Sequence, residues 1–314
     1  MDGGETNGSL EKRPQRRTKL KSPGKGRRRG FFSSFKKLRH LKVLDSNFTD
    51  EVPCELGNLT DLHTLDLGFN DLRIRNLEWL SHLSLLSYLG LSGVNLMNQT
   101  SLLHHITRFP FLEELASLTS IDLSYNRLEG PDAFGELIFL EVLVLDISYN
   151  ELNGPLPDVT EFSSLKTLIL NNNKLNGFYP QSPGLPSSLE RLDLSYNQFR
   201  RLPEELKISK TMFSGSIFHF NALIFLVLDL SDNQLEVELP NCWINISELT
   251  VLDLANNKFS GIIPPTLGSL DRLEILHLRN NNFIGELPST LRNCTRLRKL
   301  DVGGNKLTII FRHG

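Results

Sequence analysis

Leucine-like residues recur along this chain at eight, five and three positions before an asparagine. Before Asn257 they are Leu249, Leu252 and Leu254. The last two leucines alternate with polar residues, and this alternation predicts a short β-strand with one buried face. The same pattern returns at a nearly constant period through most of the chain, for example before Asn281 and Asn305. We therefore expect the strands to stack in parallel and to bury their leucines against one another.

The asparagine position, here called the slot, numbers the units. The slots are Ser46, Asn70, Val94, Asn126, Asn150, Asn173, Asn197, Thr211, Asn233, Asn257, Asn281 and Asn305. L-x-x-L-x-L-x-x-N-x-L at this period is typical of the leucine-rich repeat, so we predict a curved, right-handed leucine-rich-repeat solenoid of about 11–12 repeats. The interval before Asn126 is longer than the others and the interval before Thr211 is shorter, which predicts irregular repeats near 97–118 and 198–215.

The slot asparagine has a predicted structural role, because its inward-facing amide can bond to the backbone of adjacent turns. The predicted asparagine ladder consists of Asn70, Asn126, Asn150, Asn173, Asn197, Asn233, Asn257, Asn281 and Asn305. After the slot, segments such as Gly261–Leu270 contain glycine and proline, which permit turns and stop regular helix. We therefore expect short parallel strands on the concave face and 3-10 or extended segments on the convex face.

The first part of the chain differs in composition from the repeats. Residues 1–42 contain 14 Lys and Arg against 3 Asp and Glu, although the whole chain has a net charge of −2. We predict a basic, disordered tail over 1–34 and a leucine-rich-repeat domain over 35–314. A nuclear-localisation or nucleic-acid role for Lys12–Arg29 is less favoured than a solvated tail, because nothing later in the sequence supports nucleic-acid recognition. The sequence shows no signal peptide and no apolar run that would form a transmembrane helix.

Motifs for catalysis or metal binding are missing from the sequence. It contains no G-x-S-x-G, H-E-x-x-H, phosphate-binding glycine loop or C-x-x-C. Cys54, Cys242 and Cys294 lie in different repeats, without disulfide or metal spacing, and we expect all three to be buried. These observations predict a protein that is not an enzyme and that carries no cofactor and no metal.

Three parts of the repeat region show a family resemblance. They are Asn76–Leu83 with Leu91–Leu96, Glu238–Trp243 with Leu254–Asn257, and Asn281–Pro288 with Asn293–Thr295. Over about residues 35–308 the chain resembles the plant leucine-rich-repeat receptor-like proteins, in particular the fungal-xylanase-receptor-like group. Members of that family have a signal peptide, a cysteine-paired cap and a membrane span, so the chain resembles a receptor truncated at both ends.

This resemblance implies a recognition module at the plasma membrane or outside the cell. It would be an ectodomain fragment that binds a protein or peptide ligand and a co-receptor kinase, in defence or developmental signalling. No nucleic acid is expected as a partner. Two alternatives stay open: a secreted inhibitor of microbial cell-wall-degrading enzymes, and an intracellular leucine-rich-repeat scaffold.

Candidate binding residues lie at the strand positions that are predicted to face solvent. Aspartate recurs four residues before the slot, where it can steer a basic peptide, although a consensus structural role explains it equally well. Aromatic residues recur one position before the slot and can anchor a ligand. The candidate ligand-binding residues are Tyr125, Tyr149, Tyr196, Asp229, Asp253, His277, Arg279, Arg298 and Lys299.

N-x-S/T sequons provide candidate sites of glycosylation. They include Asn47, Asn58, Asn98, Asn245 and Asn293. Three of them (Asn58, Asn245 and Asn293) lie midway between one slot and the next, on the predicted outer side of the solenoid. Glycans there would leave the concave face free, which suits a secreted ancestry.

Overall fold

The structure is a computed structural model of the chain. It describes residues 35–74, 77–96, 117–130, 142–156, 159, 162–178, 185–186, 188–201, 226–241, 243 and 246–308. The predicted tail over 1–34 and most of both predicted irregular segments lie outside the described residues. The same holds for Asn98, Thr211, Cys242 and Asn245.

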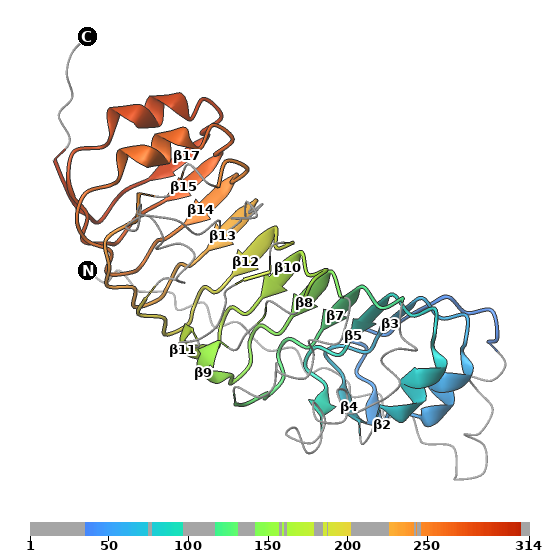
Figure 1. Cartoon of the computed structure of the whole chain (residues 1–314). Coiled ribbons are helices and arrows are strands. Elements are labelled where there is room, and N and C mark those ends of the chain that lie inside the picture. Colours follow the sequence, from blue (N-terminus) through green and yellow to red (C-terminus); the bar gives the residue numbers. More distant parts are fainter. Residues whose placement is uncertain are drawn as a thin grey trace, which may run out of the picture.

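One parallel sheet of 11 strands runs along the chain (Figure 1). The strands are β1 (His40–Lys42), β3 (Thr64–Asp66), β5 (Tyr88–Gly90), β7 (Ser120–Asp122), β8 (Val144–Asp146), β10 (Thr167–Ile169), β12 (Arg191–Asp193), β13 (Val227–Asp229), β14 (Val251–Asp253), β15 (Ile275–His277) and β17 (Lys299–Asp301). Each strand pairs with the next in one register, so Leu252 lies between Leu228 and Leu276. In Figure 1 the row of strands lies on the inner side of the curve, so the sheet forms the concave face of the predicted solenoid.

Short 3-10 helices and short strands form the opposite, convex side. The helices are η2 (Cys54–Asn58), η3 (Glu78–His82), η7 (Pro265–Ser269) and η8 (Ser289–Asn293), and the strands are β2 (Thr49–Glu51), β4 (Asp71–Ile74), β6 (Asn95–Leu96), β9 (Asn153–Leu156), β11 (Lys174–Phe178), β16 (Ile284–Gly285) and β18 (Lys306–Leu307). Successive 3-10 helices pack closely, and a Cβ added to Gly268 of η7 would collide with the Thr290 carbonyl group of η8. Glycine at this position therefore sets how closely the repeats stack.

The core is a continuous stack of leucine layers between the two sides. Leu252 and Leu276 have no exposed surface, and the rings of Phe259 and Phe283 stack with their centroids 6.0 Å apart. Leu300 in the last rung of the sheet is 41% exposed, because no described strand covers its far side. The leucine layer at this end of the described sheet is therefore open.

The asparagine ladder is confirmed at all nine predicted positions. Asn257 Nδ2 donates to the carbonyl oxygens of Leu230, Leu254 and Ala255, and Asn257 Oδ1 accepts the backbone N–H of Leu235. The amide thus joins its own turn to the preceding rung, whose backbone groups it satisfies in the interior. Asn126 differs in one respect, because its Oδ1 has no hydrogen-bond partner among the described residues, next to the long interval that precedes this slot.

The slot predicted at Thr211 lies outside the described residues, and the described strands on either side of it are neighbours in the sheet. Strand β12 pairs directly with β13, with Leu192 opposite Leu228. Asn233 donates to the carbonyl oxygen of Leu194, as if Asn197 were its neighbouring slot. The interval from Asn197 to Thr211 is much shorter than a regular turn such as that from Asn257 to Asn281, and no described rung of the sheet separates Asn197 from Asn233.

Candidate functional site on the concave face

Aspartates four residues before the slot form a row along the concave face, here called the aspartate row. Its members are Asp66, Asp122, Asp146, Asp193, Asp229, Asp253 and Asp301. In every one, Oδ1 accepts the backbone N–H of the residue two positions later, at 2.9 to 3.1 Å. This bond closes a turn at the end of each strand. Asp66 and Asp193 are buried, so their predicted exposure is wrong, and the row has a structural role.

The carboxylates of the aspartate row also repel one another. Burial is the main cause that raises the pKa of Asp229 to about 6, and the charges of Asp193 and Asp253 add to it. Burial, with the charges of Asp122 and Asp193, likewise raises the pKa of Asp146. The concave face therefore concentrates negative charge, part of which is neutralised in mild acid.

A second row lies one residue before the slot, where the backbone has the left-handed conformation in all 11 described turns of the sheet, with φ between 48° and 67°. Glycine, asparagine and aspartate accept this conformation readily, and they occupy seven of these positions. The other four carry exposed aromatic residues, here called the aromatic row: Phe69, Tyr125, Tyr149 and Tyr196. Their exposure confirms the prediction for the three tyrosines.

The aromatic row is organised by ring contacts. Tyr125 and Tyr149 stack with centroids 4.0 Å apart and planes 9° apart. The Phe69 ring meets Tyr125 nearly edge to face, with centroids 5.2 Å apart. Gly93 occupies the intervening turn, and a Cβ added there would lie 3.0 Å from Cδ1 of Phe69. The missing side chain thus lets Phe69 and Tyr125 touch across a whole repeat.

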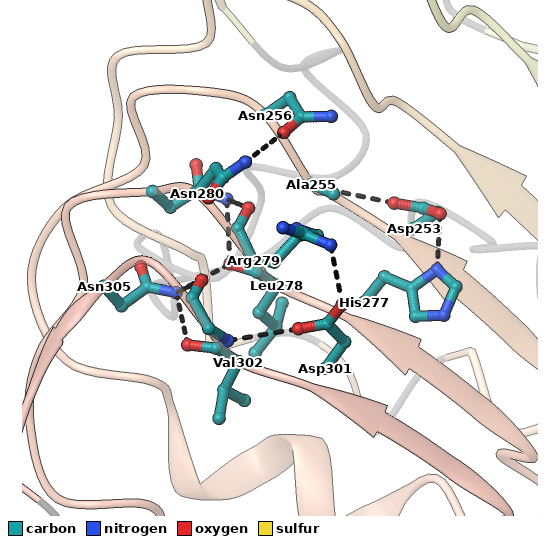
Figure 2. Close-up of polar contacts among 12 residues, drawn as sticks. Asp253, Ala255, Asn256, His277, Leu278, Arg279, Asn280, Asp301, Val302 and Asn305 are labelled. Atoms are coloured by element: carbon teal, nitrogen blue, oxygen red, sulfur yellow. Dashed lines mark hydrogen bonds and ion pairs between the residues drawn. The ribbon is translucent and has the colours of Figure 1, made fainter. Parts of the chain in front are cut away.

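Toward the C-terminal end, polar side chains continue this row. Asn280 Nδ2 donates to Asn256 Oδ1 at 2.8 Å (Figure 2). Asn256 Nδ2 in turn donates to Asp232 Oδ1 at 3.1 Å. Asn256 and Asn280 are here called the amide row, and the Asp232 carboxylate accepts a hydrogen bond from its N-terminal member. The charge of Asp232, together with burial and a hydrogen bond to it, raises the pKa of Tyr196. The aromatic row and the amide row therefore form one connected edge of the concave face.

Four of the predicted binding residues lie at the C-terminal end of the sheet: His277, Arg279, Arg298 and Lys299. His277 interrupts the aspartate row, and its Nδ1 lies 2.6 Å from Asp253 Oδ2. Arg279 Nη1 lies 3.5 Å from Asp301 Oδ2, as Figure 2 shows. Arg298 forms an exposed ion pair with Glu274 at 3.3 Å, and Lys299 is exposed. The structure thus brings these four predicted binding residues together and places three of them against carboxylates of neighbouring repeats.

Some of these contacts were outside the reach of sequence reasoning. The pairing of His277 with Asp253 and the continuous amide row both depend on the exact alignment of successive repeats. Tyr88 was also missed: burial and the nearby charges of Asp66 and Asp122 raise its pKa to about 12. The sequence does contain a signal for this residue. Tyr88 lies six residues before the slot Val94, in a repeat that has Gly90 in place of the row aspartate.

Other predicted residues lie away from the concave face. Asn58 and Asn293 are exposed and end the 3-10 helices η2 and η8, and Asn47 is exposed in a turn. Cys294 is buried as predicted, but Cys54 is exposed, because it begins η2 at the surface. Among the described residues, no group of histidine, cysteine and acidic side chains could hold a metal ion. No helix found in those same segments is long and apolar enough to cross a membrane.

Comparisons with known proteins agree with this architecture. Leucine-rich-repeat family models match residues 247–307, 117–137 and 188–208. Receptor-like protein EIX1 of Solanum lycopersicum is 29% identical, over 48% of this chain and 24% of its own length. Receptor like protein 21 of Arabidopsis thaliana is 30% identical, over 51% of this chain and 14% of its own length. The chain therefore spans at most about a quarter of these relatives.

A solved structure extends the likeness over most of the chain. The crystal structure of PEPR1-AtPEP1 matches with 30% sequence identity and a TM-score of 0.64, and it covers 88% of this chain and 36% of that one. The repeat pattern, the fold and the similar proteins thus agree on one family. The chain is a leucine-rich-repeat protein homologous to the plant receptor-like proteins.

Proposed function

We propose that the concave face of this chain binds a protein or peptide ligand. The aromatic row carries the proposal. Large aromatic side chains at φ near 50° are unfavourable by about 1–2 kcal/mol each, and glycine, asparagine or aspartate fills the equivalent position in the other described turns of the sheet. The four aromatics remain 41 to 55% exposed, so burial offers little compensation. Strained and exposed anchors of this kind are characteristic of binding surfaces.

The two ends of the face differ in chemistry, and this difference describes the ligand. The end near β7 and β8 presents aromatic rings beside carboxylates, which suits a cationic or aromatic side chain. The end near β15 and β17 presents the amide row, Arg279 and Lys299, which suits backbone amides and a carboxylate. We infer an extended ligand that carries both signs of charge and lies along the sheet.

The family relationship supports the wider biological role. We propose a cell-surface, non-catalytic receptor function in plant defence or development, with a co-receptor kinase as a further partner. In this role, glycans on Asn58 and Asn293 would project from the convex side and would leave the concave face accessible.

A selection experiment tests the binding face. The chain is presented to a phage-displayed library of random peptides, and each selected peptide is then measured by fluorescence anisotropy against two groups of variants. Tyr149→Ala and Arg279→Ala alter the concave face, whereas Arg292→Ala removes an exposed arginine from η8 on the convex side. We expect at least one of the two concave variants to weaken binding by about tenfold, the loss of about 1.4 kcal/mol, and Arg292→Ala to leave it unchanged. Equal binding to all three variants would contradict the proposal.

A further inference from the structure

Tyr125 and Tyr149 form an unusual pair for two exposed side chains. They follow β7 and β8, whose parallel register places Ile121 opposite Leu145. The centroids of their rings lie 4.0 Å apart and the ring planes are within 9° of parallel, and the interaction with the Tyr149 side chain raises the pKa of Tyr125. Tyr125 is 48% exposed and Tyr149 is 41% exposed. The sheet thus holds two phenol rings face to face and open to solvent.

This geometry suits radical coupling between the rings. One-electron oxidation of a phenol removes an electron and a proton, and the unpaired electron is shared between the oxygen and the ring carbons next to it. Two such radicals join through those ring carbons. Because the Tyr125 and Tyr149 rings are stacked with their centroids 4.0 Å apart, carbon atoms of one ring lie close to carbon atoms of the other.

We propose that Tyr125 and Tyr149 are a site of oxidative cross-linking, at which hydrogen peroxide and a haem peroxidase form an intramolecular dityrosine bond. Each ring loses one electron and one proton, and a carbon–carbon bond forms between the two ring carbons. The hydrogen on each joined carbon then moves to the phenol oxygen, which restores both aromatic rings. The two electrons and two protons released reduce one peroxide to two molecules of water.

The other described tyrosines lack this arrangement. Tyr196 is the most exposed, at 55%, but it interacts with Asp232 and makes no ring contact with another described aromatic residue. Tyr88 is only partly exposed, and its ring makes no contact with another described aromatic ring. Selectivity for the stacked pair over the more exposed Tyr196 therefore distinguishes this site from oxidation of any accessible tyrosine.

The cross-link would join two successive rungs of the sheet through their side chains. It would fix the ends of β7 and β8 to each other at the side chains that line the concave face. The inference rests on the ring pair alone and does not depend on which ligand the concave face binds. Proteins outside the cell meet oxidising surroundings, which provide the setting for such chemistry.

The test treats the full chain with a haem peroxidase and hydrogen peroxide, and then maps its peptides by mass spectrometry. We expect a species in which the Tyr125 and Tyr149 peptides are joined and two hydrogen atoms are lost, together with blue dityrosine fluorescence. The yield per chain should not change with protein concentration, because the bond is intramolecular. Tyr125→Phe and Tyr149→Phe should each abolish this product, whereas Tyr196→Phe should retain it.

The melting temperature of each variant serves as a control for folding. Because all three tyrosines are exposed, we expect it to match that of the parent chain, so that a loss of product does not reflect unfolding. A main product that joins two molecules, or that contains Tyr196, would overturn the proposal. So would oxidation of the chain without any bond between residues 125 and 149. Failure of peptide binding leaves these readouts unchanged, so this test and the test of the binding face can fail separately.

Discussion

Replacement of Asn257 by leucine tests the central structural element of the solenoid, the asparagine ladder. The amide has four hydrogen bonds to backbone groups, and only 8% of the residue's surface is exposed. Leucine has a similar volume but makes none of these bonds. The backbone N–H of Leu235 then has no other described partner. The three carbonyl oxygens each keep a second donor: Asn233 for Leu230, Asn281 for Leu254 and the N–H of Asp232 for Ala255.

The magnitude follows from one orphaned donor and three weakened acceptors. A buried polar group without a partner costs about 1–3 kcal/mol, and the net loss of a hydrogen bond at each carbonyl adds about 0.5 kcal/mol at the lower end. Together they predict a loss of about 3 kcal/mol in the free energy of unfolding. The matched variant is Asn256→Ala, one residue earlier on the exposed edge. It removes two exposed hydrogen bonds and places alanine at φ 56°, and we expect it to cost about 1 kcal/mol.

Urea unfolding followed by circular dichroism measures both variants against the parent chain. The midpoint of Asn257→Leu should fall about three times as far as that of Asn256→Ala, with similar slopes. Equal shifts would refute the reasoning, because they would mean that the slot amide contributes no more than an exposed one. A slope that changes in one variant only would point to loss of a whole end of the solenoid.

Three further predictions concern the acidic face, the open end and the convex side. The pKa of Asp229 is about 6 in the folded chain, above the value near 4 of an unfolded one, so the folded state binds more protons and stability falls as the pH rises from about 4 to 6. Asp229→Asn should remove this dependence and raise stability at pH 7 by roughly 1–2 kcal/mol, and an unchanged pH profile in urea unfolding would contradict it. Amide hydrogen exchange should be faster at Leu300, which is 41% exposed, than at the fully buried Leu228, and equal protection would show that the last rung is covered. After expression through a eukaryotic secretory pathway, glycosidase treatment should reduce the mass of the chain, and loss of the sequons at Asn58 and Asn293 should each remove one glycan.

The periodic part of the fold could be predicted from the sequence because each repeat states the same pattern independently. Leucines such as Leu252 and amides such as Asn257 occupy positions that only a parallel stack can satisfy. The direct pairing of β12 with β13 could not be predicted, because a local leucine pattern does not determine which strands become neighbours. Whether β12 pairs with the next fragment or with β13 depends on distant contacts.

The candidate site was only partly predictable, since its properties arise between repeats. Each tyrosine of the aromatic row could be identified as exposed, but the stack of Tyr125 on Tyr149 depends on how the two side chains turn from neighbouring strands. The sequence also left two roles open for the aspartates. The hydrogen bond from the backbone N–H of Ser231 to Asp229 Oδ1 demonstrates the structural one. A role in ligand binding stays a prediction.

The reach of the slot amides says something about how such a chain can change. Asn257 bonds to a carbonyl 27 residues earlier, Asn126 to one 35 residues earlier, and Asn233 to one 39 residues earlier, all with nearly the same distance of 2.9 to 3.0 Å. The slot amide donates a hydrogen bond to the neighbouring rung of the sheet, whatever the number of residues that connect the two rungs. Duplication, loss or exchange of whole repeats between genes can therefore preserve the hydrogen bonds at the junctions. A surface for new partners can then be assembled from existing parts while the interior stays as it was.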